Sequence, residues 1–371
     1  MRKINLGFLI NPIAGMGGRV GLKGTDGDMY RIAIKKGAKP VAPARALEFL
    51  NSLNLRVNLY AAPGPMGEDI VMKTHHKEDL VEIVGSLESK MTTADDTKRI
   101  SREMMKLGVD LLVFVGGDGT ARDIVDAVNQ KQLALGVPSG VKMYSAVFAV
   151  SPRAAARVVK AFAEGRTNET FAEVLDIDED AYRRNELKVR LYGYLRIPVL
   201  AGLMQASKEP SAESYEEEEN KKAIAKRIVE EMEPDTLYIL GAGTTIKAIA
   251  DELGIKKTLL GVDAIFNGKV VGEDLDEKGI LRLLEKFQKV KIIVTPIGGQ
   301  GFIFGRGNQQ ISPDVIKKVG KENIVVVATK SKIKNLDVLR VDTGDPQVDE
   351  MLRGYTKVIV DYHEDLIMKV V

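Results

Sequence analysis

The sequence predicts a soluble α/β protein of two domains, and three observations support this fold class. The chain has 371 residues, which suits two domains of the usual size of roughly 100–200 residues each. Short apolar runs alternate with helical patterns along the first part of the chain. Hydrophobic residues make up 44% and charged residues 29% of the chain, a composition that supports a packed core. We expect a three-layer N-terminal α/β domain over residues 1–150 and a mixed C-terminal domain over residues 151–371.

The N-terminal domain is expected to begin with a buried strand over residues 4–10, which ends where Asn11 and Pro12 interrupt the apolar run. Further expected elements are a helix over residues 44–53, strands over 55–61 and 80–84, a helix from the capping residues 92–96 to Gly108, a strand over 109–115 and a helix over 121–129. This alternation predicts a mostly parallel sheet with helices on both faces. In such sheets ligands bind at the carboxyl ends of the strands.

The C-terminal domain is expected to combine a strand-rich part with at least one further α/β unit. Its expected elements are helices over residues 154–163, 224–232 and 246–253, and strands over 171–177, 186–195, 236–240, 292–295, 302–304 and 324–328. The segment 256–290 is expected to contain helices. The tail, residues 356–371, is a candidate to return to the first domain and complete its sheet.

Composition excludes several classes of function. The chain contains no cysteine, which rules out disulfides, zinc–thiolate sites and thiol catalysis. Its 54 basic and 52 acidic side chains nearly balance, so neither nucleic acid nor a membrane surface is expected as a partner. No apolar run reaches the roughly 18 residues that span a bilayer, and the first run is interpreted as a strand rather than a signal peptide. We therefore expect a cytoplasmic protein. The adjacent His75 and His76 are expected to be an exposed, solvated pair.

The most informative motif is the string Gly116-Gly117-Asp118-Gly119-Thr120, which lies between an apolar strand and a helix. The glycines permit unusual backbone angles and the close approach of a ligand. The free N–H groups and partial positive charge of a helix N-terminus suit phosphate. A carboxylate beside phosphate would repel it, so Asp118 is expected to face a hydroxyl group that it deprotonates, or a magnesium ion. The alternative is that Asp118 only caps the helix.

This string resembles the signature of the kinase superfamily that includes NAD kinases, 6-phosphofructokinases and diacylglycerol and sphingosine kinases. The stretch 11–18 is similar to the asparagine-proline-x-x-glycine opening of that superfamily. Together with residues 136–142, these motifs look most like the ATP-NAD kinase-like proteins of archaea and bacteria. In the C-terminal half, residues 241–245 resemble the threonine-glycine-serine-threonine loop of NAD kinases, and residues 292–297 resemble the strand that follows it.

The resemblance implies a Rossmann-like, phosphofructokinase-like first domain, a homo-oligomer, and phosphoryl transfer from ATP or polyphosphate to the 2′-hydroxyl of the NAD adenosine ribose. Mg²⁺ would bridge the donor phosphates. Asp118 would contact the acceptor hydroxyl and act as its base. Nucleotide or phosphate contacts are expected from Asn11, Gly15, Gly17, Gly116, Gly117, Gly119, Thr120, Arg122, Lys142, Gly243, Thr244 and Thr245. The asparagine–glutamate pair that holds adenosine in the family has its nearest counterpart at residues 176–179, so Asp178 and Glu179 are the candidate acceptor contacts, and no metal ligand is assigned.

Two alternative functions remain open. The first is a kinase of the same superfamily with another hydroxyl acceptor, such as a small polyol, a sugar or a lipid headgroup. The second is a nucleotide-binding module without turnover. The glycine-rich run 298–307, which carries Gln300 and Arg306, is a further candidate for a ligand-facing loop.

Overall fold

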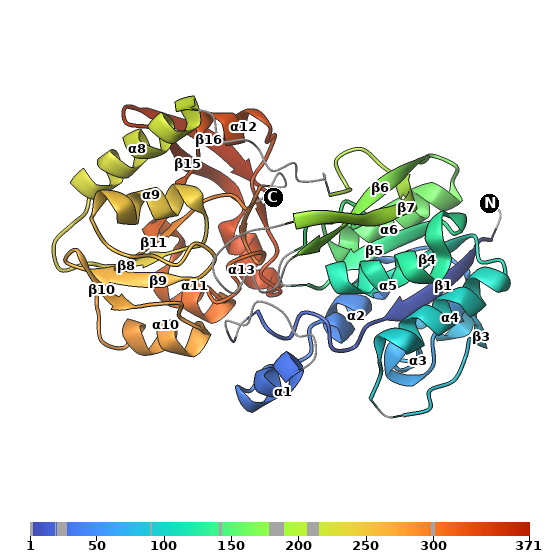
Figure 1. Cartoon of the computed structure of the whole chain (residues 1–371). Coiled ribbons are helices and arrows are strands. Elements are labelled where there is room, and N and C mark those ends of the chain that lie inside the picture. Colours follow the sequence, from blue (N-terminus) through green and yellow to red (C-terminus); the bar gives the residue numbers. More distant parts are fainter. Residues whose placement is uncertain are drawn as a thin grey trace. The chain divides into compact units, whose positions relative to one another are not determined.

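The computed structural model describes residues 3–18, 20, 28–89, 91–140, 143–177, 189–205, 215–297 and 301–371. The chain forms two compact units, one of Met1–Met16 and Gly24–Lys208 and one of Gly17–Lys23 and Glu209–Val371. The structure thus places the boundary well beyond residue 150, where the sequence predicted it. Each unit is described by itself below (Figure 1).

The first unit is built on a parallel sheet of five strands in the order β3-β2-β1-β4-β5. The strands are β1 (Asn5–Ile10), β2 (Asn58–Ala61), β3 (Leu80–Ile83), β4 (Leu111–Gly116) and β5 (Ala134–Pro138). The helices are α1 (Asp28–Lys35), α2 (Ala42–Ser52), α3 (Glu68–Val71), α4 (Ala94–Lys106), α5 (Asp118–Val128) and α6 (Pro152–Ala163). The predicted α/β class is confirmed. Helix α5 begins earlier than expected, at Asp118 itself, and α1, α3 and β5 were not predicted from the sequence.

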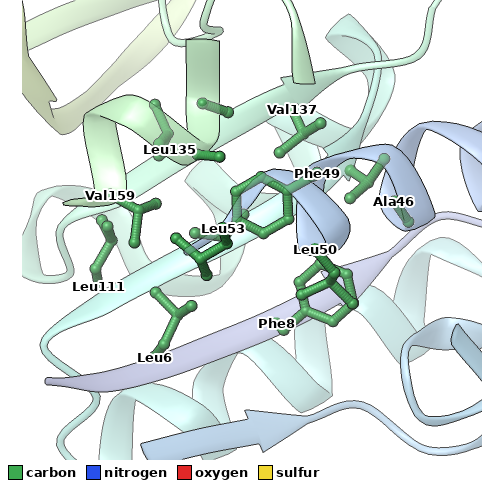
Figure 2. Close-up of a cluster of buried hydrophobic side chains, with 14 of the residues drawn as sticks. Leu6, Phe8, Ala46, Phe49, Leu50, Leu53, Leu111, Leu135, Val137 and Val159 are labelled. Atoms are coloured by element: carbon green, nitrogen blue, oxygen red, sulfur yellow. The ribbon is translucent and has the colours of Figure 1, made fainter. Parts of the chain in front are cut away.

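Apolar side chains cover both faces of this sheet. On one face α2 and α6 pack on the strands, and Phe8 of β1 stacks on Phe49 of α2 with ring centroids 5.9 Å apart (Figure 2). On the other face lie α4 and α5, with Ile100 and Ile124 in the core. The result is the three-layer arrangement that the alternating pattern predicts.

A two-stranded antiparallel ribbon extends the first unit beyond the predicted boundary. It consists of β6 (Asn168–Ile177) and β7 (Val189–Val199). Val174 and Leu195 of this ribbon are fully buried in the same core as α4 and α5. Residues 151–208 therefore belong to the first unit because their apolar side chains complete its core.

The second unit contains a mixed sheet of seven strands in the order β10-β9-β8-β11-β13-β15-β16. Its strands are β8 (Leu237–Leu240), β9 (Asp263–Phe266), β10 (Lys269–Gly272), β11 (Val290–Val294), β13 (Ile324–Val327), β15 (Gly354–Asp361) and β16 (Glu364–Val370), with β12 (Phe302–Phe304) and β14 (Arg340–Val341) as a separate parallel pair. The four central strands β8, β11, β13 and β15 are parallel. The tail pairs as β15 on β13 and β16 on β15, so the prediction that it completes the first sheet is wrong.

Helices cover both faces of this second sheet as well. They are α8 (Tyr215–Glu230), α9 (Thr244–Glu252), α10 (Glu277–Leu284), α11 (Pro313–Val319), α12 (Lys330–Lys334) and α13 (Pro346–Leu352). Side chains of α8 and α9 form the core on one face, and those of α10, α11 and α13 form the core on the other. The segment 256–290, expected to contain helices, contains α10, and the β9–β10 hairpin precedes this helix. Within the described residues, no helix has the length and apolar character needed to cross a bilayer.

The expectation of a solvated histidine pair is wrong for one of its two members. His75 is exposed, but His76 is fully buried. Its Nδ1 lies 2.9 Å from Asp79 Oδ2, and its Nε2 lies 2.9 Å from the carbonyl oxygen of Leu53. The hydroxyl of Thr74 accepts a hydrogen bond from the His76 amide and starts the short turn that directs this ring inward.

Candidate active site

Two predicted motifs meet where the strand order of the first sheet reverses. From β1 the chain proceeds to β2 on one side, and from β4 it proceeds to β5 on the other. Asn11, directly after β1, donates from Nδ2 to Oγ1 of Thr120 at 3.0 Å, which ties the loop after β1 to the first turn of α5. Ligands of open α/β sheets bind in the crevice at such a reversal point. The sequence placed Asn11 and Thr120 in one site, and the structure brings them together.

The backbone rather than side chains lines this reversal point. Gly15 has φ of +80°, and a Cβ there would lie 1.9 Å from the carbonyl oxygen of Ser139, so only glycine fits. The amide of Ser139 donates to the carbonyl of Gly116 at 3.0 Å, which joins the loop after β5 to the same place. Among the described residues, the buried hydroxyl of Ser139 has no hydrogen-bond partner. An unpaired buried polar group of this kind suggests a ligand or a water molecule.

The first turn of α5 supplies hydrogen-bond donors to this site. Its N-cap is Gly117, whose lack of a side chain leaves the first amides of the helix uncapped. Gly117, Asp118 and Gly119 are partly exposed, whereas Thr120 is buried. The amides of a helix N-terminus together with its partial positive charge make a site for an anion such as phosphate.

Asp118 does not cap its own helix, so the alternative assignment from the sequence is wrong. Its carboxylate accepts hydrogen bonds from the backbone amides of Tyr144 at 2.8 Å and Ser145 at 3.0 Å. Burial raises the pKa of Asp118 above its ordinary value, although the hydrogen bonds from Ser145 and Tyr144 and the charge of Arg122 oppose the shift. A carboxylate has about four acceptor positions, so this group can still accept a hydroxyl proton from a ligand.

Arg122 of α5 takes part in an ion-pair cluster around Asp176 of β6. Its guanidinium hydrogen-bonds to Oδ1 of Asp176, which is 5% exposed. Arg190 holds the other oxygen of Asp176, with Nη2 at 2.6 Å and Nε at 2.8 Å. Because two arginines already hold this aspartate, the predicted contact of Arg122 with phosphate requires it to give up part of this pairing.

A second reversal point occurs in the second sheet. From β8 the chain proceeds to β9 on one side, and from β11 it proceeds to β13 on the other. Gly243, with φ of +122°, precedes α9 at this point, and a Cβ there would lie 2.8 Å from the Cγ2 of Thr295. Thr295 is 1% exposed, and within the part of the chain that the structure describes its hydroxyl has no partner. The loop 241–245 therefore lies at the kind of reversal point where ligands of open α/β sheets bind.

The remaining predicted residues divide into three groups. Thr244 is exposed at the start of α9, and Thr245 is buried. Gly17 is buried and belongs to the second unit, apart from Asn11 and Gly15. Lys142, Asp178, Glu179 and Gln300 lie outside the described residues.

Sequence reasoning also missed two kinds of participant. Tyr144 and Ser145 contribute backbone amides to Asp118, and a backbone donor leaves no residue-type signature. Ser139 and Thr295 lie inside motifs that the resemblance pointed to, and their position directly after a strand was the available signal.

A parallel sheet with glycine-lined loops, a helix N-terminus and a carboxylate at its reversal point fits the class of nucleotide-dependent phosphotransferases. Comparison with known families agrees with this class. The ATP-NAD kinase N-terminal domain matches residues 6–167, and the ATP-NAD kinase C-terminal domain matches residues 234–370. The chain therefore belongs to the NAD kinase-like family and is a phosphotransferase of the NAD kinase type. No individual curated protein and no solved structure gives a significant match.

Proposed function

We propose that the protein transfers the terminal phosphoryl group of ATP, or of polyphosphate, to the 2′-hydroxyl of the adenosine ribose of NAD, which gives NADP. The observation that carries this proposal is Asp118, a carboxylate of raised pKa at the junction of β4 and α5. It lies beside the helix N-terminus that suits phosphate. A hydroxyl acceptor and a phosphate donor therefore have adjacent places in the first unit.

In this mechanism Asp118 accepts the proton of the acceptor hydroxyl as that oxygen bonds to phosphorus. The bond between the terminal phosphorus and its bridging oxygen breaks, and the nucleoside diphosphate or shortened polyphosphate leaves. A base works best when its pKa approaches the working pH, so the effect of burial on Asp118 favours this role. The amides of the first turn of α5 would stabilise the charge on the phosphoryl oxygens.

A divalent metal fits the site as part of the nucleotide. Within the described residues, no group of three histidine, aspartate or glutamate side chains lies close enough to hold an ion. Mg²⁺ is usually bound by one or two carboxylates and the phosphates of the substrate. The ion would therefore be held mainly by the donor phosphates and by water, which leaves Asp118 to accept the hydroxyl proton. The bound ion would neutralise charge on the donor phosphates.

The second reversal point would provide further nucleotide contacts. Thr244 is exposed at the N-terminus of α9, and Thr295, whose hydroxyl is unpaired among the described residues, lies next to Gly243. Two hydroxyl groups beside a helix N-terminus suit phosphate or ribose oxygens. This reasoning supports the nucleotide contacts expected for Gly243 and Thr244.

The partners that we propose are small nucleotides and further copies of this chain. The ribbon of β6 and β7 exposes Phe171 (56%) and Leu191 (50%), apolar side chains that a second subunit could cover. Size-exclusion chromatography with light scattering checks this: we expect a homo-oligomer that Phe171→Lys and Leu191→Lys dissociate, and a monomeric wild type contradicts it.

The test of the function compares Asp118→Asn with Asp126→Asn, a matched change on the same helix. Each protein is incubated with Mg-ATP and NAD, and products are identified by mass. We expect NADP from the wild type and from Asp126→Asn, with turnover of Asp118→Asn reduced by roughly 10²–10⁴-fold through loss of the base. Wild-type turnover by a folded Asp118→Asn protein would remove this residue from the mechanism.

The same assay separates the alternative functions. A panel of polyols, sugars and lipid headgroups replaces NAD as the acceptor. Phosphorylation of one of these and not of NAD identifies a kinase with another acceptor. Binding of nucleotide without consumption of ATP or polyphosphate identifies a module without turnover.

A further inference from the structure

The turn that follows β12 contains two adjacent amide oxygens that lack a hydrogen-bond donor. They are Oδ1 of Asn308 and Oε1 of Gln309, both buried and without a partner among the described residues. Asn308 is 1% exposed, and its Nδ2 donates to the carbonyl of Ile303 at 2.7 Å. A carbonyl can only accept, so this bond fixes the orientation of the amide, and the unpaired atom of Asn308 is its oxygen.

A buried acceptor without a donor loses its hydrogen bonds to water without replacement, and two such acceptors on neighbouring residues are exceptional. The turn is also firmly placed. Gly305 has φ of +88°, and a Cβ there would lie 1.9 Å from the carbonyl oxygen of Asp342. The guanidinium carbon of Arg306 lies 4.4 Å from the ring centroid of Phe302. Its Nη2 lies 3.9 Å from Oδ2 of Asp342. The amides of residues 308 and 309 therefore start from a fixed backbone.

A glycine of the N-terminal loop lies directly against one of the two oxygens. A Cβ on Gly18 would lie 2.4 Å from Oε1 of Gln309, closer than real side chains approach. Gly18 belongs to the same unit as this turn. The Gln309 amide therefore occupies the space that a side chain at position 18 would need, so glycine is required there and the loop holds this amide in place.

The chemistry of the two oxygens selects the ligand. Two neutral acceptors repel phosphate, whose oxygens are also acceptors, and they attract N–H donors. We propose that Asn308 and Gln309 form a subsite for the amino nitrogen of a planar nucleotide group. The donor is either the exocyclic amine of adenine or the carboxamide of nicotinamide, which share this chemistry. This inference rests on the proposed function, because NAD carries both groups.

The test measures binding by isothermal titration calorimetry and requires no turnover. The three ligands are NAD, its analogue with hypoxanthine in place of adenine, and its analogue with nicotinic acid in place of nicotinamide. Each analogue replaces one amino group by oxygen. We expect the wild type to bind one of the two analogues at least about tenfold more weakly than NAD. In that complex the buried oxygens of Asn308 and Gln309 face an oxygen of the ligand instead of an amino group. The analogue that binds more weakly identifies which amino group of NAD the subsite holds.

Variants connect this preference to the two side chains. For the weaker-binding analogue, the ratio of its dissociation constant to that of NAD is expected to fall close to one in Asn308→Leu and Gln309→Met. A general loss of stability would weaken both ligands equally and leave the ratio unchanged. The matched control is Asn323→Leu, since Nδ2 of Asn323 also donates to a backbone carbonyl, that of Val319 at 2.8 Å. The control should keep the wild-type ratio.

The outcomes separate this inference from the function on which it rests. If the wild type binds NAD and both analogues equally, or if both variants keep the preference, the subsite is refuted and the proposed function stands. If the wild type binds no NAD, both fail. Should Asn308→Leu not fold, Gln309→Met decides, because Gln309 is only partly buried and tolerates the change more easily.

Discussion

At the scale of single residues, the environment of Asp118 determines how activity should depend on pH. Burial raises its pKa, and a base must be deprotonated to work. Activity should therefore fall as pH drops through this raised pKa, above the ordinary value of about 3.9 for aspartate. The measurement is kcat/KM against pH with Mg-ATP and NAD. An acid limb at the ordinary carboxyl pKa would contradict the role of burial.

The raised pKa of Asp118 also determines how this residue makes the stability of the fold depend on pH. A raised pKa in the folded state means that the folded protein binds this proton more tightly than the unfolded chain. The contribution of Asp118 to stability is thus fully present below its unfolded pKa and is lost as pH rises through its folded pKa. An active site that needs the charged carboxylate therefore works where this residue stabilises the fold least.

A buried ion pair beside the loop 241–245 gives a second prediction at this scale. Lys257 and Asp263 are each 1% exposed at the side chain, and Nζ lies 3.1 Å from Oδ2. Nζ also donates to the carbonyls of Thr258 and Gly261. Burial lowers the pKa of Lys257, and the charge of Asp263 opposes this. The pair stabilises the segment whose Leu259 carbonyl accepts from the amide of Gly243.

We expect Lys257→Met to destabilise the protein by about 3–5 kcal/mol, because it leaves the buried charge of Asp263 with its hydrogen bonds from Thr258 and Asp274 but without the counter-charge of Lys257. The double variant Lys257→Met with Asp263→Asn should recover part of this loss, since no buried charge remains. Urea unfolding of the two single variants and the double variant measures the coupling. Additive effects in this cycle would show that the two charges do not depend on one another.

Sequence patterns identified the type and place of the main site residues but not their pairings. Asn11, Thr120 and Asp118 were predicted because each follows a buried strand in a recognisable string. The partner of Arg122 lies 54 positions away at Asp176, and only the folded ribbon brings the two together. Pairings of this kind depend on tertiary structure, which no local pattern contains.

At the scale of elements, the start of α4 permits a quantitative prediction. Thr93 and Asp96 form a capping box, in which Asp96 Oδ2 accepts from the Thr93 amide at 3.0 Å and the Thr93 hydroxyl accepts from the Asp96 amide at 3.4 Å. Thr93→Ala should cost about 1 kcal/mol of unfolding free energy, and Thr93→Ser should retain most of it. Denaturant unfolding measures the change. Equal stability of the alanine variant would show that the box contributes nothing.

Local signals also explain which elements the sequence predicted and which it missed. The helix before Gly108 was predicted from its cap and its apolar spacing, and the structure confirms both. The β9–β10 hairpin was missed although Asn267-Gly268 connects its strands. Both residues have positive φ, 47° and 71°, which is the backbone of the favoured two-residue hairpin turn. That dipeptide was a usable signal within a segment interpreted only by its helical pattern.

At the scale of the whole molecule, the assignment of segments to units was the least predictable feature. The tail has the apolar pattern of a strand pair, and this pattern fits either sheet. Its pairing with β13 in the second sheet depends on register and on the core beneath it, where Val358 and Val360 are fully buried. A strand pattern predicts that a segment joins a sheet, whereas the remaining core determines which strand it pairs with.

The extent of the first unit gives the last prediction. Residues 151–208 contribute Val158 and Val159 to one core face, and Val174, Leu195 and Ile197 to the other, and all five are at most 2% exposed. Each such side chain is worth about 1.5–3 kcal/mol on burial, so their sum is comparable to the roughly 5–15 kcal/mol stability of a domain. A chain that ends at residue 208 should therefore show a cooperative thermal transition by circular dichroism, and one that ends at residue 150 should not. A cooperative transition in the shorter chain would show that α6 and the β6–β7 ribbon are dispensable for the core.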